Sequence, residues 1–313
     1  MKALAVIGAT ASGKTALSLS LATRLGAEII VCDSMQIYRG MDIGTAKPTP
    51  REQAACPHHL IDLAEPDTSF SASDYAVAAM AAVRDITARG KLPIFCGGTG
   101  LYLDAVRTGR HTAATPPPDP ALRASLQAEA ETPEGRLLLY RRLSDIDPDA
   151  AATTHPNNVH RVVRALEMYL TTGKTKTTLD REAPTENPEL SLYVIEPVFQ
   201  DRAALYARID ARVDAMMAAG LAEETERLRR AGVFTKNATA AAAIGYKELL
   251  PCLDGICTKE EAVETLKRAT RRYAKRQMTY FRRIPGVVTV GADGKTPDEM
   301  AEELLPGILA FLA

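Results

Sequence analysis

The sequence predicts an α/β fold in which a parallel-sheet core is interrupted by a mostly helical insertion. Short apolar runs, typical of buried parallel strands, alternate with segments of helical periodicity. That alternation stops in the middle of the chain and later resumes. With 313 residues, of which 46% are hydrophobic, the chain can bury a substantial core.

Five short apolar runs are predicted to be strands: residues 4–7, 27–32, 92–96, 191–196 and 287–290. After the first run, leucines at helical spacing predict a helix that begins near Lys14 and stops at Gly26. A long helix is predicted for residues 258–283, a stretch without proline or glycine. This order of strands and helices is typical of a parallel sheet.

Three prolines at residues 116–118 mark the start of the interruption. Helix-start signals then follow near Asp119, Pro133 and Asn158. We therefore predict a helical insertion domain over residues 113–188, inserted into a catalytic core made of residues 1–112 and 189–313.

The composition limits the compartment and the kind of partner. The net charge is −1 and the sequence pI is near 6.5, so nucleic-acid binding requires a local concentration of lysine and arginine. The five cysteines form no C-x-x-C pair, which disfavours a structural metal site and fits free thiols in a reducing compartment. The first apolar run is too short for a signal peptide, and no segment reaches transmembrane length. We expect a cytoplasmic protein that binds no membrane, with a monomer as the default state.

The clearest motif lies between the first strand and the first helix. Its residues fit the pattern G-x-x-x-x-G-K-[ST]: Gly8, Ala9, Thr10, Ala11, Ser12, Gly13, Lys14 and Thr15. Glycines let backbone N–H groups close around phosphate oxygens, Lys14 adds positive charge, and Thr15 supplies a ligand for Mg²⁺. The core is therefore expected to be P-loop NTPase-like. Since kinases, ATPases and GTPases share this loop, it predicts phosphate or nucleotide binding, with ATP the common occupant, but no particular reaction.

Two further loops follow predicted strands at the same edge of the sheet. Because the carboxyl ends of parallel strands meet at one edge, Asp33 is expected to face the crevice beside the phosphate loop. Asp33 is either a Mg²⁺ ligand or a general base for an acceptor amine or hydroxyl. The next loop, residues 97–100, reads Gly-Gly-Thr-Gly and has Thr99 as its one polar side chain. Thr99 either donates a hydrogen bond to a leaving oxygen or caps the following helix.

A local basic patch lies in the second half of the long predicted helix. Residues 267–283 contain no acidic residue and include three aromatic ones. The basic residues are Lys267, Arg268, Arg271, Arg272, Lys275, Arg276, Arg282 and Arg283. Phosphate contacts combined with aromatic stacking are typical of proteins that hold single-stranded RNA loops. The alternative is that this basic patch has no binding role and is simply the solvent-exposed face of a helix.

Several longer motifs together resemble the bacterial tRNA dimethylallyltransferases. The motifs are residues 8–15, 33–48 (DSMQIYRGMDIGTAKP), 97–102 (GGTGLY), 155–158 (HPNN), 243–248 (AIGYKE) and 273–277 (YAKRQ). They occur in the family's order and cover nearly the whole chain. The resemblance implies that the phosphate loop holds the diphosphate of dimethylallyl diphosphate, with Mg²⁺. It also implies that the acceptor is N6 of the adenine next to the anticodon, in tRNAs that read codons beginning with U.

The resemblance also implies catalytic roles. Asp33 would accept or orient the amine proton, while Thr99 and Lys14 would stabilise the departing diphosphate. Arg208 and Arg212 lie on one face of a predicted helix, in a stretch from which a basic group reaches the diphosphate in the family. The sequence leaves open which of the two reaches it.

The alternative for these two arginines is pairing with nearby acids such as Asp201 or Asp214.

Contacts with the tRNA anticodon stem-loop are assigned by the same resemblance. The base pocket would consist of Asp33, Ser34, Met35, Gln36 and Thr99. The other contacts would be Arg123, His160, Arg161, Val162, Val163, Arg164, Gly245, Tyr246, Lys247, Lys275, Arg276, Gln277 and Arg282. Two other functions remain open, an adenylate isopentenyltransferase and a P-loop small-molecule kinase. The helical insertion and the basic helix argue against the first, because a free nucleotide needs neither.

Overall fold

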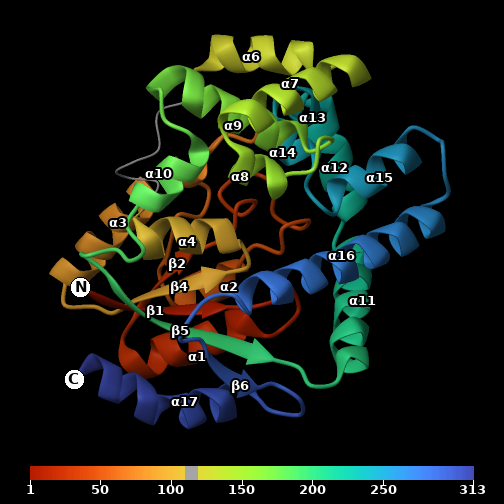
Figure 1. The fold of residues 1–313 in the computed structure, drawn as a ribbon. Helices are drawn as coiled ribbons and strands as arrows, with labels where there is room; N and C mark the ends of the chain where they lie inside the picture. The colour runs from red at the N-terminus through yellow and green to blue at the C-terminus, as the bar shows by residue number, and fades with distance from the viewer. Residues whose placement is uncertain (110–118) are drawn as a thin grey trace. The chain divides into compact units, whose positions relative to one another are not determined.

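The computed structural model describes residues 1–109 and 119–313, which form a six-stranded sheet in the order β3-β2-β4-β1-β5-β6 (Figure 1). All neighbouring strands are parallel. The strands are β1 (Lys2–Ile7), β2 (Glu28–Val31), β3 (His58–His59), β4 (Pro93–Gly97), β5 (Ser191–Val198) and β6 (Val288–Gly291). The five predicted strands are therefore present. The sixth, β3, has two residues and no apolar run, so periodicity could not reveal it.

Helices connect the strands and form most of the rest of the chain. In the sheet-containing part they are α1 (Lys14–Leu25), α2 (Pro50–Ala55), α3 (Ala72–Ala88), α4 (Gly100–Thr108), α11 (Arg202–Ala218), α12 (Leu221–Arg230), α13 (Val233–Lys236), α14 (Ala238–Ala241), α15 (Tyr246–Leu253), α16 (Lys259–Phe281) and α17 (Pro297–Leu312). The inserted part contains α6 (Pro120–Glu129), α7 (Pro133–Ile146), α8 (Pro148–Ala152), α9 (Val159–Thr172) and α10 (Lys176–Glu182). Among the described residues, no helix has the length and apolar character needed to cross a membrane.

The central strand β1 shows why the sheet is covered on both faces. All but its first residue are buried, so the strand reads as a continuous apolar run. Leu4 and Val6 pack with side chains of α1 and α17. Ala3, Ala5 and Ile7 point to the other face and pack with side chains of α3 and α4. In Figure 1, α3 and α4 lie on one side of the sheet, and α1 and α17 lie on the other. This burial on two sides fixes the edge at which the loops after β1, β2 and β4 emerge.

The chain divides into two compact units, Met1–Arg107 with Asn187–Ala313, and Thr108–Glu186. The first predicted boundary, between residues 112 and 113, lies outside the described residues. The second was placed between 188 and 189 but is found between Glu186 and Asn187. Asn187 belongs to the core because its Nδ2 donates a 2.9 Å hydrogen bond to the carbonyl of Val106.

The inserted unit has a small core of its own. Leu139 and Leu143 of α7 pack with Val162, Val163 and Leu166 of α9, and each of these side chains is almost fully buried. The apolar positions of α9 therefore form one stripe along the helix, the usual pattern for a helix that packs on a core. On the opposite face of α9, His160 and Arg161 are exposed.

Candidate active site

The phosphate loop connects β1 to α1 and adopts a backbone that gathers N–H groups at the helix N-terminus. Ala11 and Gly13 have φ angles of 62° and 91°, in the left-handed region, which gives the loop its curvature. Within the described residues, the amides of Gly13, Lys14 and Thr15 have no protein acceptor. The hydroxyl of Ser12 is also buried without a partner there. Unused donors at a helix N-terminus favour an anion.

Two cations with few counter-charges lie beside this loop. Lys14 Nζ donates a 3.3 Å hydrogen bond to the carbonyl of Ala9. Burial lowers the pKa of Lys14, and the positive charge of Arg212 lowers it further. Burial also lowers the pKa of Arg212, while the nearby carboxylate of Asp33 opposes that change. Two mutually repelling cations in a partly buried site would be stabilised by a bound anion.

Arg208 lies against the backbone of the same loop. Its Nε donates a 3.0 Å hydrogen bond to the carbonyl of Ala11, and its guanidinium lies 5.4 Å from the ring centre of Phe199. The acids suggested as alternative partners are used elsewhere. Asp201 caps α11, and Asp214 pairs with Lys267 at 2.7 Å.

The structure therefore places both arginines on the phosphate-loop side of α11, with Arg208 on the loop backbone and Arg212 near Lys14 and Asp33.

The loops after β2 and β4 are joined by hydrogen bonds at the same sheet edge. Thr99 Oγ1 accepts from the backbone N–H of Ser34 at 2.9 Å and donates to the Ser34 hydroxyl at 3.3 Å. Its hydroxyl therefore links two loops and does not cap α4. Asp33 Oδ1 accepts from the N–H of Met35 at 3.0 Å, which fixes the turn after β2. Asp33, Ser34, Met35 and Thr99 are all partly exposed, so a ligand can reach them.

Gln36 is oriented by the turn that follows. Its Nε2 donates to the carbonyls of Thr45 and Ala46, at 3.0 and 3.1 Å. Both neighbours are acceptors, so the amide nitrogen must face them and the amide oxygen faces away. Gln36 is partly exposed, which leaves that oxygen as its free hydrogen-bonding atom.

The same turn is held by Glu224 of α12, a residue that the sequence motifs did not reveal. Its buried carboxylate accepts the N–H groups of Asp42, Ile43 and Gly44 at 3.0–3.1 Å, and the hydroxyl of Tyr246 at 2.8 Å. Gly44 is required here, because a Cβ atom would lie 2.5 Å from the Tyr246 ring. The only feature of the sequence that could have pointed to Glu224 was that two of its neighbours in the fold, Gly44 and Tyr246, both belong to recognised motifs.

Tyr246 is fully buried and Gly245 is also buried, so a surface contact with RNA does not fit either residue. Lys247, the next residue, is exposed. The motif over residues 243–248 therefore serves mainly to hold the turn after Asp33.

The basic helix α16 is only partly free to bind an anion. Arg271 pairs with Asp210 of α11 at 2.6 Å and with Glu264 at 3.1 Å, and Lys267 pairs with Asp214. These counter-charges lie outside the window of residues 267–283, so the lack of acids in that window was misleading. The cations that stay exposed are Arg268, Arg272, Lys275, Arg276, Arg282 and Arg283. Gln277 is buried, which does not fit the predicted RNA contact.

In the inserted unit, the predicted RNA contacts have different environments. Val162 and Val163 are core residues, so their burial argues against a surface role. Arg123 and Arg164 each donate a 2.8 Å hydrogen bond to Glu167, whose side chain is fully buried. Hydrogen bonds from the two arginines keep the pKa of Glu167 low although burial opposes this.

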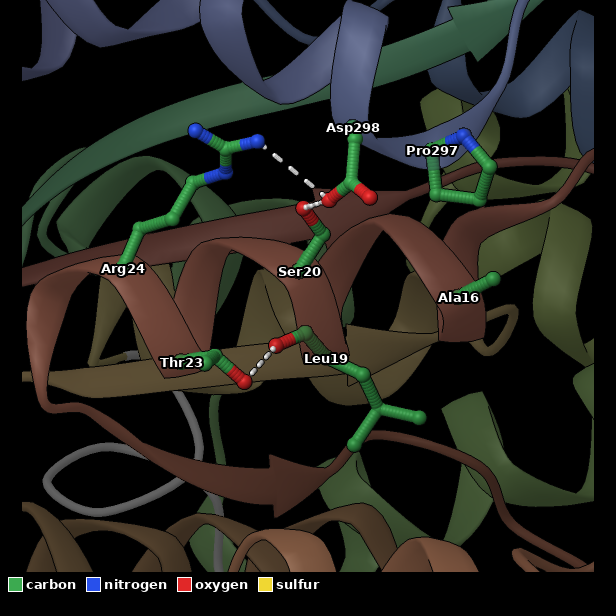
Figure 2. A pocket seen from close by; sticks show the side chains of 7 residues that line it. All are labelled: Ala16, Leu19, Ser20, Thr23, Arg24, Pro297 and Asp298. Carbon is green, nitrogen blue, oxygen red and sulfur yellow. Dashed lines mark hydrogen bonds and ion pairs between the residues drawn. The ribbon is translucent and has the colours of Figure 1, made fainter.

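An open depression of about 450 Å³ lies between α1 and α17 (Figure 2). Arg24 and Ser20 of α1 both bond to Asp298 at the start of α17 (Figure 2). These contacts attach α17 to the sheet-covering helix α1. The depression contains none of the predicted site residues.

Comparison with known proteins agrees with this arrangement. The model of the IPP transferase family matches residues 36–284. A tRNA dimethylallyltransferase of Roseiflexus sp. (strain RS-1) is 45% identical over 302 residues, covering 96% of this chain and 97% of the relative. The tRNA dimethylallyltransferase of Bacillus subtilis (strain 168) is 48% identical over 279 residues, covering 88% and 86%.

Solved structures give the same result. The full-length tRNA isopentenylpyrophosphate transferase of Bacillus halodurans superimposes with a TM-score of 0.70 at 42% identity, covering 98% of this chain and 96% of that one. A eukaryotic dimethylallyltransferase acting on tRNA gives a TM-score of 0.80 at 30% identity, covering 93% and 74%. The sheet core with its phosphate loop is thus the P-loop NTPase-like fold of these enzymes, and the chain belongs to the IPP transferase family.

Proposed function

We propose that this protein transfers the dimethylallyl group of dimethylallyl diphosphate to N6 of a tRNA adenine and releases diphosphate. Membership of the family and near full-length similarity to tRNA dimethylallyltransferases support transfer to tRNA. The structural observation that carries the proposal is the group formed by Lys14, Arg212 and Asp33. Two cations for a diphosphate and a carboxylate for an amine lie within electrostatic reach of one another at one sheet edge.

The phosphate loop holds the leaving group in this proposal. The free amides of residues 13–15, the Lys14 ammonium and the two α11 arginines stabilise the negative charge that develops on the diphosphate. Thr99, held by the Ser34 N–H, donates its proton to an oxygen of the bound diphosphate in place of the Ser34 hydroxyl. Mg²⁺ suits the oxygen donors available there, the Thr15 hydroxyl and the phosphate oxygens, and when bound it would supply further positive charge.

Asp33 acts on the acceptor. As the adenine N6 forms a bond to the allylic carbon, the bond from that carbon to the diphosphate oxygen breaks and its electron pair leaves with the diphosphate. N6 then carries an excess proton, which Asp33 accepts. The base must leave its stack to reach this pocket, so extrusion of the adenine is expected. Gln36, with its amide oxygen directed away from the turn, would line the base pocket.

The RNA is held by the exposed cations of α16 and by the two arginines that follow it, together with exposed residues of the inserted unit such as His160 and Arg161. The acceptor is proposed to be the adenine next to the anticodon in tRNAs that read codons beginning with U. The protein is proposed to act in the cytoplasm as a monomer.

The test is incubation of the protein with unmodified tRNA and dimethylallyl diphosphate, followed by mass spectrometry of the nucleosides. An adenosine that gains one C₅H₈ group is the expected product. Parallel reactions with AMP as the acceptor and with ATP as the donor identify the other two functions. Prenylation of AMP without tRNA would contradict the proposal and indicate an adenylate isopentenyltransferase. Phosphate transfer from ATP would contradict it and indicate a small-molecule kinase.

A further inference from the structure

Gln277 is a buried residue on a helix whose exposed positions are basic. It lies in α16 and is only 6% exposed. Its Oε1 accepts the backbone N–H of Thr10 at 2.9 Å, and its Nε2 donates to the carbonyl of Gly98 at 2.9 Å. One side chain therefore joins α16 to the phosphate loop and to the loop after β4. Both amide atoms of Gln277 are used inside the protein.

The two bonds require an amide side chain in one orientation. Thr10 offers a donor and Gly98 offers an acceptor, so the oxygen and nitrogen of Gln277 cannot be exchanged. A glutamate could accept from Thr10 but could not donate to Gly98, and a leucine could do neither. Gly98 lacks a side chain for the same reason, because a Cβ atom there would collide with Nε2 of Gln277.

The neighbouring positions on the same face of α16 contact the same loops. Tyr273, one turn earlier, lies near Gln277 and Thr99, and burial raises its pKa, so its hydroxyl stays protonated. Tyr280, one turn later, bonds to Asp104 of α4, and its ring occupies the space where Gly100 would carry a Cβ atom. This face of the helix is attached to the active-site loops.

The exposed cations Lys275 and Arg276 lie on the same helix turn as Gln277 but point to solvent. α16 therefore has two surfaces with different chemistry, a basic one for phosphates of RNA and a neutral one for the loops.

We infer that Gln277 is a positioning residue that sets the phosphate loop against the loop carrying Thr99, and that it does not contact RNA. The inference deepens the proposed function, on which it rests. Lys14 and Thr99 belong to different loops but are proposed to act on the same diphosphate. A shift of about 1 Å between such groups commonly costs on the order of 100-fold in rate.

The experiment uses the full chain and four variants. Gln277→Leu removes both hydrogen bonds at similar volume, and Gln277→Glu removes only the bond to Gly98. Lys275→Gln removes a neighbouring exposed cation, and Thr279→Ala changes an exposed neighbour that is outside the site. Binding of inorganic diphosphate by calorimetry, tRNA affinity, kcat, KM for each substrate and the melting temperature are measured for each.

Gln277→Leu is expected to lower kcat by about 10- to 100-fold and to weaken diphosphate binding, with tRNA affinity within about twofold of wild type. Gln277→Glu should show a similar loss, because its buried carboxylate faces the Gly98 carbonyl. Lys275→Gln should weaken tRNA binding and leave diphosphate binding unchanged. Thr279→Ala should behave as wild type in every measurement.

Two results would overturn the inference. If Gln277→Leu weakens tRNA binding as Lys275→Gln does, with diphosphate binding unchanged, Gln277 is an RNA contact. If it lowers only the melting temperature while kcat and diphosphate binding stay normal below that temperature, its role is purely structural. Diphosphate binding is measured without tRNA, so its loss in Gln277→Leu is informative even if wild type transfers no dimethylallyl group.

Discussion

The hydroxyl of Tyr246 donates a 2.8 Å hydrogen bond to the carboxylate of Glu224, which also accepts three consecutive backbone N–H groups of residues 42–44. The turn held in this way continues to Thr45 and Ala46, whose carbonyls orient Gln36. A buried carboxylate outside the proposed site therefore controls the shape of the proposed base pocket.

Replacing Glu224 with glutamine should destabilise the protein by about 2–3 kcal/mol, because the new NH₂ group faces backbone donors and leaves them unsatisfied. The KM for tRNA should rise, since the turn that holds Gln36 loses its acceptor. Urea unfolding and steady-state kinetics measure the two effects. Glu226→Gln, on the same helix and bonded to Arg229 and Arg230, is the control and should change stability much less than Glu224→Gln. Equal stability of both variants would contradict this role for Glu224.

Asp33→Ala should keep tRNA affinity but lower the single-turnover rate of transfer by about 10²- to 10⁴-fold, the usual contribution of a general base. Asp33→Asn keeps the side-chain oxygen that accepts from the Met35 N–H, so it separates loss of the base from loss of the turn. Rapid-quench measurement of prenylated tRNA gives the rate. Normal transfer by Asp33→Asn would show that the carboxylate is not the proton acceptor.

The strands and the phosphate loop were predictable because their signals are local. An apolar run of four to six residues that ends at a glycine or aspartate predicts a buried strand without information from the rest of the chain. The roles of Tyr246 and Gln277 were not predictable in this way. Both residues belong to motifs of the family. Whether a motif residue faces solvent or a buried partner, however, depends on how distant segments of the chain pack against it. Glu224 was missed because its partners lie far away in the sequence, and no local pattern marks a helical glutamate as buried.

Charge on α16 shows the same limit. The sequence window of residues 267–283 contains no acid, yet Asp210 of α11 lies 2.6 Å from Arg271 in the structure.

Replacing the exposed residues Arg272, Lys275 and Arg282 with glutamine should weaken tRNA binding and flatten its dependence on salt concentration, since each substitution removes an exposed cation. Arg271→Gln should leave the salt slope nearly unchanged and lower stability instead. Filter binding between about 50 and 200 mM salt measures the slopes. A larger slope change for Arg271→Gln than for the triple variant would contradict this assignment.

Glu28, at the start of β2, should make the core sensitive to acid. Its carboxylate bonds to Arg89 at 2.5 and 2.7 Å and to His59 at 2.7 Å, and its side chain is only 8% exposed. The bonds to Arg89 lower the Glu28 pKa from 4.5 to about 2 although burial opposes this. The folded-state pKa is below the unfolded one, so this contribution, about 3 kcal/mol, is complete above pH 4.5 and is lost as the pH falls toward 2.

Glu28→Gln should therefore be less stable than wild type at pH 7 by about 2–3 kcal/mol, and the difference should shrink steadily below pH 4.5. Urea unfolding at a series of pH values measures it. Glu65→Gln is the matched control, because Glu65 pairs with Arg39 in a contact where both side chains are more than half exposed, and it should give a small difference at every pH. A gap between Glu28→Gln and wild type that stays constant down to pH 3 would mean that the Arg89 pair does not depress the Glu28 pKa.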